Sequence, residues 1–192
     1  MGKLAGYILI MNISGFLSYL LKLWYASRKS GKQSDKAVMA VAMAGGSIGV
    51  LLAVFLVDRK TKKENMMVRV FAICVLIIQT IVLLMIRGCR ADTLSFAIWK
   101  PFIGNRILWI YLAAINFISF AVYAIDKVNA AAGKRRIRII TLLGLACLGG
   151  SVGALLAMYL LRHKTKKNYF TSGILLIMLT HLVLLFYFVN FG

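Results

Sequence analysis

Apolar residues fill six long stretches of this 192-residue chain, and polar residues gather in the short segments between them. The stretches cover residues 7–25, 37–57, 68–86, 107–125, 139–161 and 170–190. Each is close to the roughly 20 residues that a helix needs to cross about 30 Å of hydrocarbon. The pattern predicts an all-α integral membrane protein.

The pattern occurs twice, with a spacing of 104 residues. Residues 45–63 read GGSIGVLLAVFLVDRKTKK, and residues 149–167 read GGSVGALLAMYLLRHKTKK. A long internal repeat usually marks two units of the same architecture. We therefore expect two pseudosymmetric repeats, residues 1–90 and 107–192, joined by a connector at 91–106.

A glycine-rich break lies at the centre of each middle stretch. Paired glycines permit positive φ, and they divide each stretch into two arms of about 15 Å, half the hydrocarbon thickness. Each middle stretch is therefore either a re-entrant hairpin or one kinked helix with glycine contacts to its neighbours. Six continuous spans would make the repeats inverted in topology. The break residues are Gly45, Gly46, Ser47 and Gly49, then Gly149, Gly150, Ser151 and Gly153.

Charge adds an argument for the hairpins. The chain is 61% hydrophobic and carries 24 lysines and arginines against 5 acids, a net charge of +19. Six crossings would divide the connector cations 11 to 12 between the two sides, whereas two hairpins would divide them 18 to 5. Cytoplasmic connectors of membrane proteins carry an excess of lysine and arginine. The hairpin arrangement thus predicts a cell-membrane protein with cytoplasmic basic connectors.

The basic residues that follow each break form a candidate binding face. Attraction to anionic lipid headgroups is worth about 1 kcal/mol per cation near the surface. The same charges would also concentrate small anions at a pore mouth. Nucleic acid is the least favoured partner, because exposed aromatic residues are not interleaved with the cations. The face comprises Arg59, Lys60, Lys62 and Lys63, with Arg162, His163, Lys164, Lys166 and Lys167.

Polar residues at helical spacing form a stripe on the first span of each repeat. Polar groups within a span usually face the bundle interior or a wet cavity, so two stripes that met would line a path between the repeats. The alternative is hydrogen bonding between helices by the asparagines, with Tyr19, Tyr123 and Lys22 as anchors at the membrane interface. The stripes contain Asn12, Tyr19 and Lys22 in the first repeat, and Asn116, Ser119, Tyr123 and Asp126 in the second.

Two titratable residues have open assignments. Asp126 has Lys127, Lys22 of the other repeat, or the basic stretch after it as candidate partners. His181 lies deep in the last stretch, where the 104-residue spacing aligns it with Ile77. It is either a proton relay or a neutral donor between helices. The chain contains no motif of a known enzyme class, so we expect no catalytic residue, metal or cofactor.

The second repeat resembles a bacterial family called domain of unknown function 1294. The resemblance rests on the aspartate–lysine pair at 126–127, the glycine motif at 149–153 and the arginine–histidine–lysine–threonine run that begins at 162. The first repeat is similar to a degenerate copy with Lys22 in place of Asp126, and Arg138 and Ile139 occupy the family's proline and glutamate positions. The resemblance implies a membrane fold and no established activity, although cold-shock fusions among relatives keep a nucleic-acid role as a weak alternative.

Two functions follow from these features. The first is a small channel or transporter for an ion or solute, with its path at the interface between the repeats. The second is a non-transporting scaffold that binds anionic lipid or a protein partner through the basic face. Homo-oligomerisation is compatible with both functions.

Overall fold

The computed structural model of the chain describes residues 2–28, 35–57, 65–88, 95–97 and 99–191. Six helical segments in these ranges are long and apolar enough to cross a membrane: Leu4–Arg28, Lys36–Val57, Met66–Arg87, Arg106–Ala131, Ile139–Leu160 and Tyr169–Asn190. Large apolar side chains remain exposed on them, including Ile110 at 68% and Phe117 at 74%. Such a surface suits hydrocarbon, and the prediction of an all-helical, multi-pass membrane protein is confirmed.

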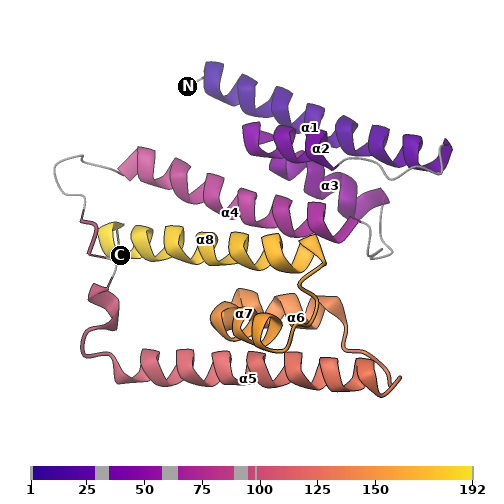
Figure 1. Ribbon diagram of the computed structural model, residues 1–192. Helices are drawn as coiled ribbons and strands as arrows, with labels where there is room; N and C mark the ends of the chain where they lie inside the picture. The colour runs from indigo at the N-terminus through magenta and orange to yellow at the C-terminus, as the bar shows by residue number, and fades with distance from the viewer. Residues whose placement is uncertain (1, 29–34, 58–64, 89–94, 98, 192) are drawn as a thin grey trace. The chain divides into compact units, whose positions relative to one another are not determined.

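The chain divides into two compact units, Met1–Leu83 and Leu84–Gly192. Unit 1 begins with the long helix α1 (Gly2–Arg28). The middle stretch follows as α2 (Lys36–Val41), the turn η1 (Ala42–Gly46) and α3 (Ser47–Val57). Helix α4 (Met66–Gly88) comes next (Figure 1). Its last residues lie beyond the unit boundary at Leu83.

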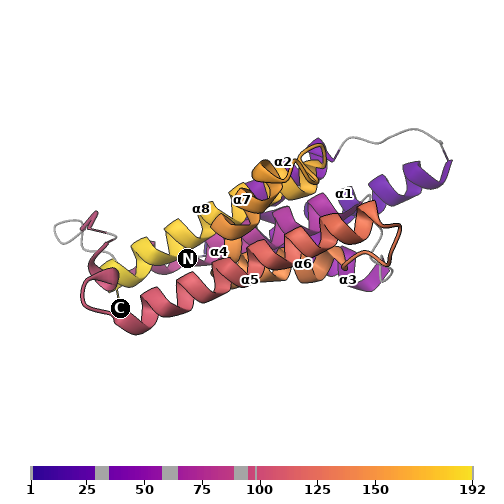
Figure 2. The same cartoon turned by 60° about the horizontal axis from the view of Figure 1, so that its bottom comes forward.

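Unit 2 repeats this order of elements. After the short 3-10 helix η4 (Lys100–Phe102) comes the long helix α5 (Arg106–Ala131). The middle stretch consists of α6 (Ile139–Leu145), the turn η5 (Ala146–Gly150) and α7 (Ser151–Leu160). Helix α8 (Asn168–Phe191) ends the unit. Both α6 and α7 pack against α5 (Figures 1 and 2).

The middle stretch of unit 2 is a re-entrant hairpin. Ile137, just before α6, and His163, just after α7, both hydrogen bond to Asp126 near the C-terminal end of α5. At the other end of α5, the Tyr111 hydroxyl donates to the Leu148 carbonyl at 2.6 Å. Helix α6 therefore runs away from Asp126 and α7 returns to it. Each arm is too short to cross the hydrocarbon alone.

Unit 1 contains the same hairpin. Lys22 Nζ contacts Asp35, just before α2, and Asn65, after α3, so both ends of the hairpin meet one point on α1. The Tyr7 hydroxyl donates to the Ala44 carbonyl at 2.7 Å at the hairpin tip. Of the two alternatives left by the sequence, these contacts select the hairpin over the kinked helix.

The first glycine of each pair makes the reversal possible. Gly45 has φ +116° and Gly149 has φ +108°, a region that residues with a Cβ rarely adopt. The second glycine permits close packing instead, since a Cβ at Gly150 would lie 2.7 Å from the Ser119 Cβ. The two glycines thus have separate roles.

Each unit has its own core, to which the first helix, the hairpin and the third helix contribute. In unit 1 the fully buried Tyr19 belongs to a cluster with Val38, Val50 and Val54. In unit 2, Tyr123 is equally buried and meets the Phe170 ring edge-on at 5.9 Å. Both tyrosines are buried among the helices of their own unit, so neither ring has the exposure that an anchor at the membrane interface requires.

Candidate functional site

Asn116 caps the interrupted helix in unit 2. A helix start leaves its first N–H groups without partners, and the residue before α7, Gly150, offers no side chain. Asn116 Oδ1, on α5, accepts from the Gly153 N–H at 2.7 Å, the third residue of α7. Its Nδ2 donates to the Gly149 carbonyl at 3.1 Å and to the Leu112 carbonyl at 2.8 Å. A side chain from another helix thus performs the function of an N-cap residue.

Asn12 has the same role in unit 1. Its Oδ1 accepts from the Gly49 N–H at 2.8 Å, and its Nδ2 donates to the Ile8 carbonyl at 2.8 Å. Unsatisfied backbone groups are costly in hydrocarbon, so the broken helix requires such a partner. Each asparagine is therefore directed at the break of its own unit, as the interhelical alternative to a polar path predicted.

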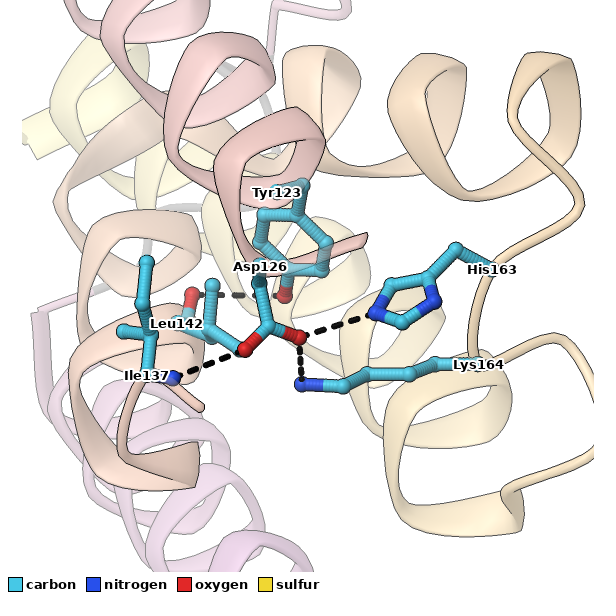
Figure 3. A network of polar contacts seen from close by, with 6 residues as sticks. All are labelled: Tyr123, Asp126, Ile137, Leu142, His163 and Lys164. Atoms are coloured by element: carbon cyan, nitrogen blue, oxygen red, sulfur yellow. Dashed lines mark hydrogen bonds and ion pairs between the residues drawn. The ribbon is translucent and has the colours of Figure 1, made fainter. Parts of the chain in front are cut away.

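Asp126 holds the two ends of the hairpin in unit 2 (Figure 3). The carboxylate is fully buried. Oδ1 accepts from the Ile137 N–H at 2.8 Å, while Oδ2 contacts His163 Nε2 at 2.8 Å and Lys164 Nζ at 2.7 Å. A buried carboxylate is tolerated when charged donors surround it in this way. We call Asp126, Ile137, His163 and Lys164 the anionic clamp.

A tight turn after α7 presents His163 and Lys164 to Asp126. The His163 N–H bonds to the Met158 carbonyl at 2.9 Å and the Arg162 N–H to the Tyr159 carbonyl at 3.2 Å, the pattern of a Schellman cap. Arg162 and Lys164 have φ +45° and +61°, where glycine is usual. Such backbone costs free energy that surrounding contacts must offset. Here the offset comes from the anionic clamp and from the Phe170 ring, 4.4 Å from Lys164 Nζ.

Unit 1 makes the same connection with the charges inverted. Lys22, which occupies the position of Asp126, is only 9% exposed. Its Nζ forms an ion pair with Asp35 and donates to Asn65 Oδ1 at 2.9 Å. We call these three residues the cationic clamp. Lys22 therefore has its partners within unit 1, contrary to its candidacy as a partner of Asp126.

His163 differs from its expected role. The sequence assigned it to the exposed cationic band, yet it lies against Asp126 and its side chain is 15% exposed. Lys164 is 14% exposed and belongs to the same clamp. Arg162, Lys166 and Lys167 are exposed, as the basic face requires. The residues expected in the first basic run, Arg59, Lys60, Lys62 and Lys63, lie outside the described residues.

His181 aligns with Gln79 and not with Ile77. His181 Nε2 contacts the Cys147 carbonyl at 2.9 Å, and Gln79 Nε2 donates to the equivalent Met43 carbonyl at 2.9 Å. The two carbonyls are 104 residues apart, whereas the two side chains are 102 apart, so the spacing shortens by two residues in the third helix of the unit. The contact agrees with the interhelical role for His181.

Four participants had no signal in the sequence that singled them out: Asp35, Asn65, Gln79 and the backbone of Ile137. Each lies outside the repeated motifs. A search for polar residues at both ends of each middle stretch would have found Asp35 and Asn65. Ser119, a predicted stripe residue, is fully buried, and its hydroxyl has no partner among the described residues.

Across the parts of the chain that the structure describes, His, Cys, Asp and Glu side chains form no group of three that would hold a metal ion. The anionic clamp is also saturated by its own donors. Its arrangement joins the ends of a hairpin to a helix, which is a structural role.

Comparison with known proteins identifies the central part of unit 2. Residues 116–170 match the model of a family described as Protein of unknown function (DUF1294). No curated protein and no solved structure matches the chain. The matched range runs from Asn116 to Phe170 and contains the anionic clamp and the glycine break, whereas the kinship of unit 1 to this family stays a prediction. Residues 116–170 of the chain therefore match the DUF1294 family.

Proposed function

We propose that this protein is a non-transporting scaffold of the plasma membrane that binds anionic lipid through a basic, cytoplasmic end. The observation that carries the proposal is the re-entrant hairpin of unit 2. Because its two ends meet at Asp126, the basic segments 134–138 and 162–167 lie at the same end of α5. A continuous helix would have put them on opposite sides of the membrane.

The charges at this end are exposed and of one sign. Among the residues described there, the single acid is Asp126, which is buried and bonded to Lys164. At about 1 kcal/mol per cation near an anionic surface, such a cluster would give strong attraction to the inner leaflet. The exposed cations are Lys127, Lys134, Arg135, Arg136, Arg138, Arg162, Lys166 and Lys167.

Two matched double variants test the proposal. Arg135→Gln/Arg136→Gln removes two cations from the basic end, and Lys100→Gln/Arg106→Gln removes two exposed cations from the N-terminal side of unit 2. Purified protein is titrated with phosphatidylglycerol in phosphatidylcholine nanodiscs, and bound anionic lipid is counted by native mass spectrometry. We expect the first variant to lose affinity by about 30-fold, on the scale of 1 kcal/mol for each of its two charges, and the second to resemble the wild type.

Equal losses in the two variants would show a general charge effect and contradict the proposal. Loss of a protein partner in a pull-down, with lipid binding unchanged, would assign the basic end to a protein instead. Lys164 is omitted from these variants because it belongs to the anionic clamp.

The channel or transporter stays a prediction with its own test. The polar stripes on which it rested are bonded within each unit, through Asn12 and Asn116 to the breaks and through Lys22 and Asp126 to the hairpin ends. Reconstitution in liposomes, with measurement of chloride, proton and alkali-cation flux, addresses it directly. Flux above that of empty vesicles would reverse our preference for the scaffold.

A further inference from the structure

A groove of about 870 Å³ opens beside the hairpin tip of unit 2. It lies between α5, the break and α8, and apolar side chains such as Trp109, Leu112, Met178 and Leu185 form most of its wall. Its polar side chains include Ser151 and His181. Small-molecule sites commonly have this size and this combination of an apolar wall with few polar groups.

Unit 1 has the equivalent groove, but it is much smaller, about 310 Å³. Its wall includes Asn12, Ser47 and Gln79, the counterparts of Asn116, Ser151 and His181. Because these positions correspond, a comparison with unit 1 shows which polar contacts the groove of unit 2 lacks.

The missing group is a carboxamide. In unit 1, Gln79 Oε1 accepts from the Ser47 hydroxyl at 2.6 Å, and Nε2 donates to the carbonyls of Ala42 and Met43, each at 2.9 Å. In unit 2, His181 makes one of these contacts, to the Cys147 carbonyl at 2.9 Å. His181 therefore reproduces one of the three contacts that Gln79 makes in unit 1.

Ser151 is the counterpart of Ser47, whose hydroxyl donates to Gln79 in unit 1. It is 4% exposed, and its hydroxyl has no hydrogen-bond partner within the described ranges of the chain. It also begins α7, a helix of ten residues whose N-terminus favours a hydrogen-bond acceptor. Ser151 lines the groove, and a hydroxyl without a partner is costly in an apolar setting, so a ligand that pairs with it gains a specific contact.

We propose that this groove binds a long-chain lipid with an uncharged, hydroxyl-bearing head group, of the monoacylglycerol or diacylglycerol class. A ligand hydroxyl replaces the side chain of Gln79: it accepts from Ser151 and donates to the ring nitrogen of His181 that has no partner among the described residues. The acyl chain lies along the apolar wall between α5 and α8.

The depth of the site favours an uncharged head group. Ser151 and His181 lie within helical segments apolar enough to cross the membrane, where a charged group is expensive. A hydroxyl both donates and accepts, which suits a serine hydroxyl beside an imidazole nitrogen. The inference does not depend on the proposed function, because the groove lies at the hairpin tip and the basic end lies at the hairpin base.

Tryptophan quenching tests the site in the full chain. The substitutions Trp24→Phe and Trp99→Phe leave Trp109, in the groove wall, as the single reporter. In phosphatidylcholine nanodiscs, the probe is a monoacylglycerol with a dibrominated acyl chain. We expect saturable quenching by this probe, and weak, non-saturable quenching by the methyl ester of the same brominated fatty acid.

Three variants complete the design. His181→Gln introduces the carboxamide that unit 1 has at this position. The new side chain should hydrogen bond to Ser151 in place of the ligand and weaken probe binding about 10-fold or more. Ser151→Ala should weaken probe binding several-fold, which corresponds to the loss of one or two hydrogen bonds. Ser47→Ala, the matched change in unit 1, should leave Trp109 quenching unchanged. Equal quenching by probe and ester, or wild-type binding by both unit 2 variants, would overturn the site. If His181→Gln does not fold, Ser151→Ala alone decides.

Discussion

Individual side chains in this protein replace backbone partners that the glycine breaks remove. Asn12 and Asn116 come from a neighbouring helix, yet they satisfy the third N–H of α3 and α7. An N-cap residue normally belongs to the helix that it caps. Here the preceding residue of each helix is a glycine, so the capping group is supplied through tertiary contact.

Removal of this cap should destabilise unit 2. Asn116→Leu is close in volume but leaves the Gly153 N–H without a partner, and a buried unsatisfied donor costs about 1–3 kcal/mol. We expect a loss of that size in the free energy of unfolding, measured by SDS titration in detergent micelles. Phe117→Leu, at a residue that is 74% exposed, is the control and should change little. Wild-type stability of Asn116→Leu would contradict the capping role.

The two residues of positive φ after α7 should respond in opposite ways to glycine. Arg162 is exposed and does not belong to the anionic clamp, so Arg162→Gly should relieve backbone strain and raise stability by up to about 1 kcal/mol. Lys164→Gly relieves the same strain but removes the ion pair with Asp126, so we expect net destabilisation. Thermal unfolding of the two variants gives the comparison, and a gain in both would argue against the clamp.

At the scale of elements, the hairpin arm α7 packs directly on the backbone of α5. A Cβ at Gly153 would overlap the Asn116 carbonyl oxygen, and this position has no flexible side chain that could move aside. The close approach also brings the Gly153 N–H to Asn116 Oδ1. Small residues are used in this way where helices meet in membranes.

Gly153→Ala should therefore force the arm away from α5 and destabilise unit 2 by about 1–3 kcal/mol, the usual cost of overpacking. Gly144→Ala is the matched control in α6, since a Cβ there meets no atom within 4 Å. That change should be neutral or stabilise by about 0.5–1 kcal/mol, because alanine favours helix. Urea or SDS unfolding measures both, and equal effects of the two alanines would refute the close packing.

At the scale of the whole molecule, the two units close their hairpins with opposite charges. In unit 1 a lysine on the first helix holds an aspartate and an asparagine, and in unit 2 an aspartate holds a histidine and a lysine. Each arrangement neutralises a charge buried at the base of the hairpin. Both units therefore have a polar clamp at this position, and the charge of its central residue is positive in unit 1 and negative in unit 2.

The hairpins also determine the membrane topology. Single cysteines at positions 135 and 166 should label from the same side of the membrane, and a cysteine at position 105, near the start of α5, from the other. The background replaces Cys74, Cys89 and Cys147 with serine. An impermeant maleimide applied to intact and to lysed cells distinguishes the sides. Labelling of positions 135 and 166 from opposite sides would show that the middle stretch crosses the membrane.

The sequence by itself determined the protein class, the six apolar stretches, the repeated breaks and the basic segments. Each of these features follows from the local amino-acid composition, because a residue's preference for hydrocarbon or water depends little on distant neighbours. The positive φ at Gly45 and Gly149 belongs to the same category, since glycine alone makes it inexpensive.

Only the tertiary structure decided which groups meet. It selected the hairpin over the kinked helix, directed the polar stripes into their own units, moved His163 from the basic face to Asp126 and aligned His181 with Gln79. Each result joins residues that lie 11 to 37 positions apart in the chain. Spacing within one helix predicts which side chains share a face, but the partner of that face depends on how separate helices pack.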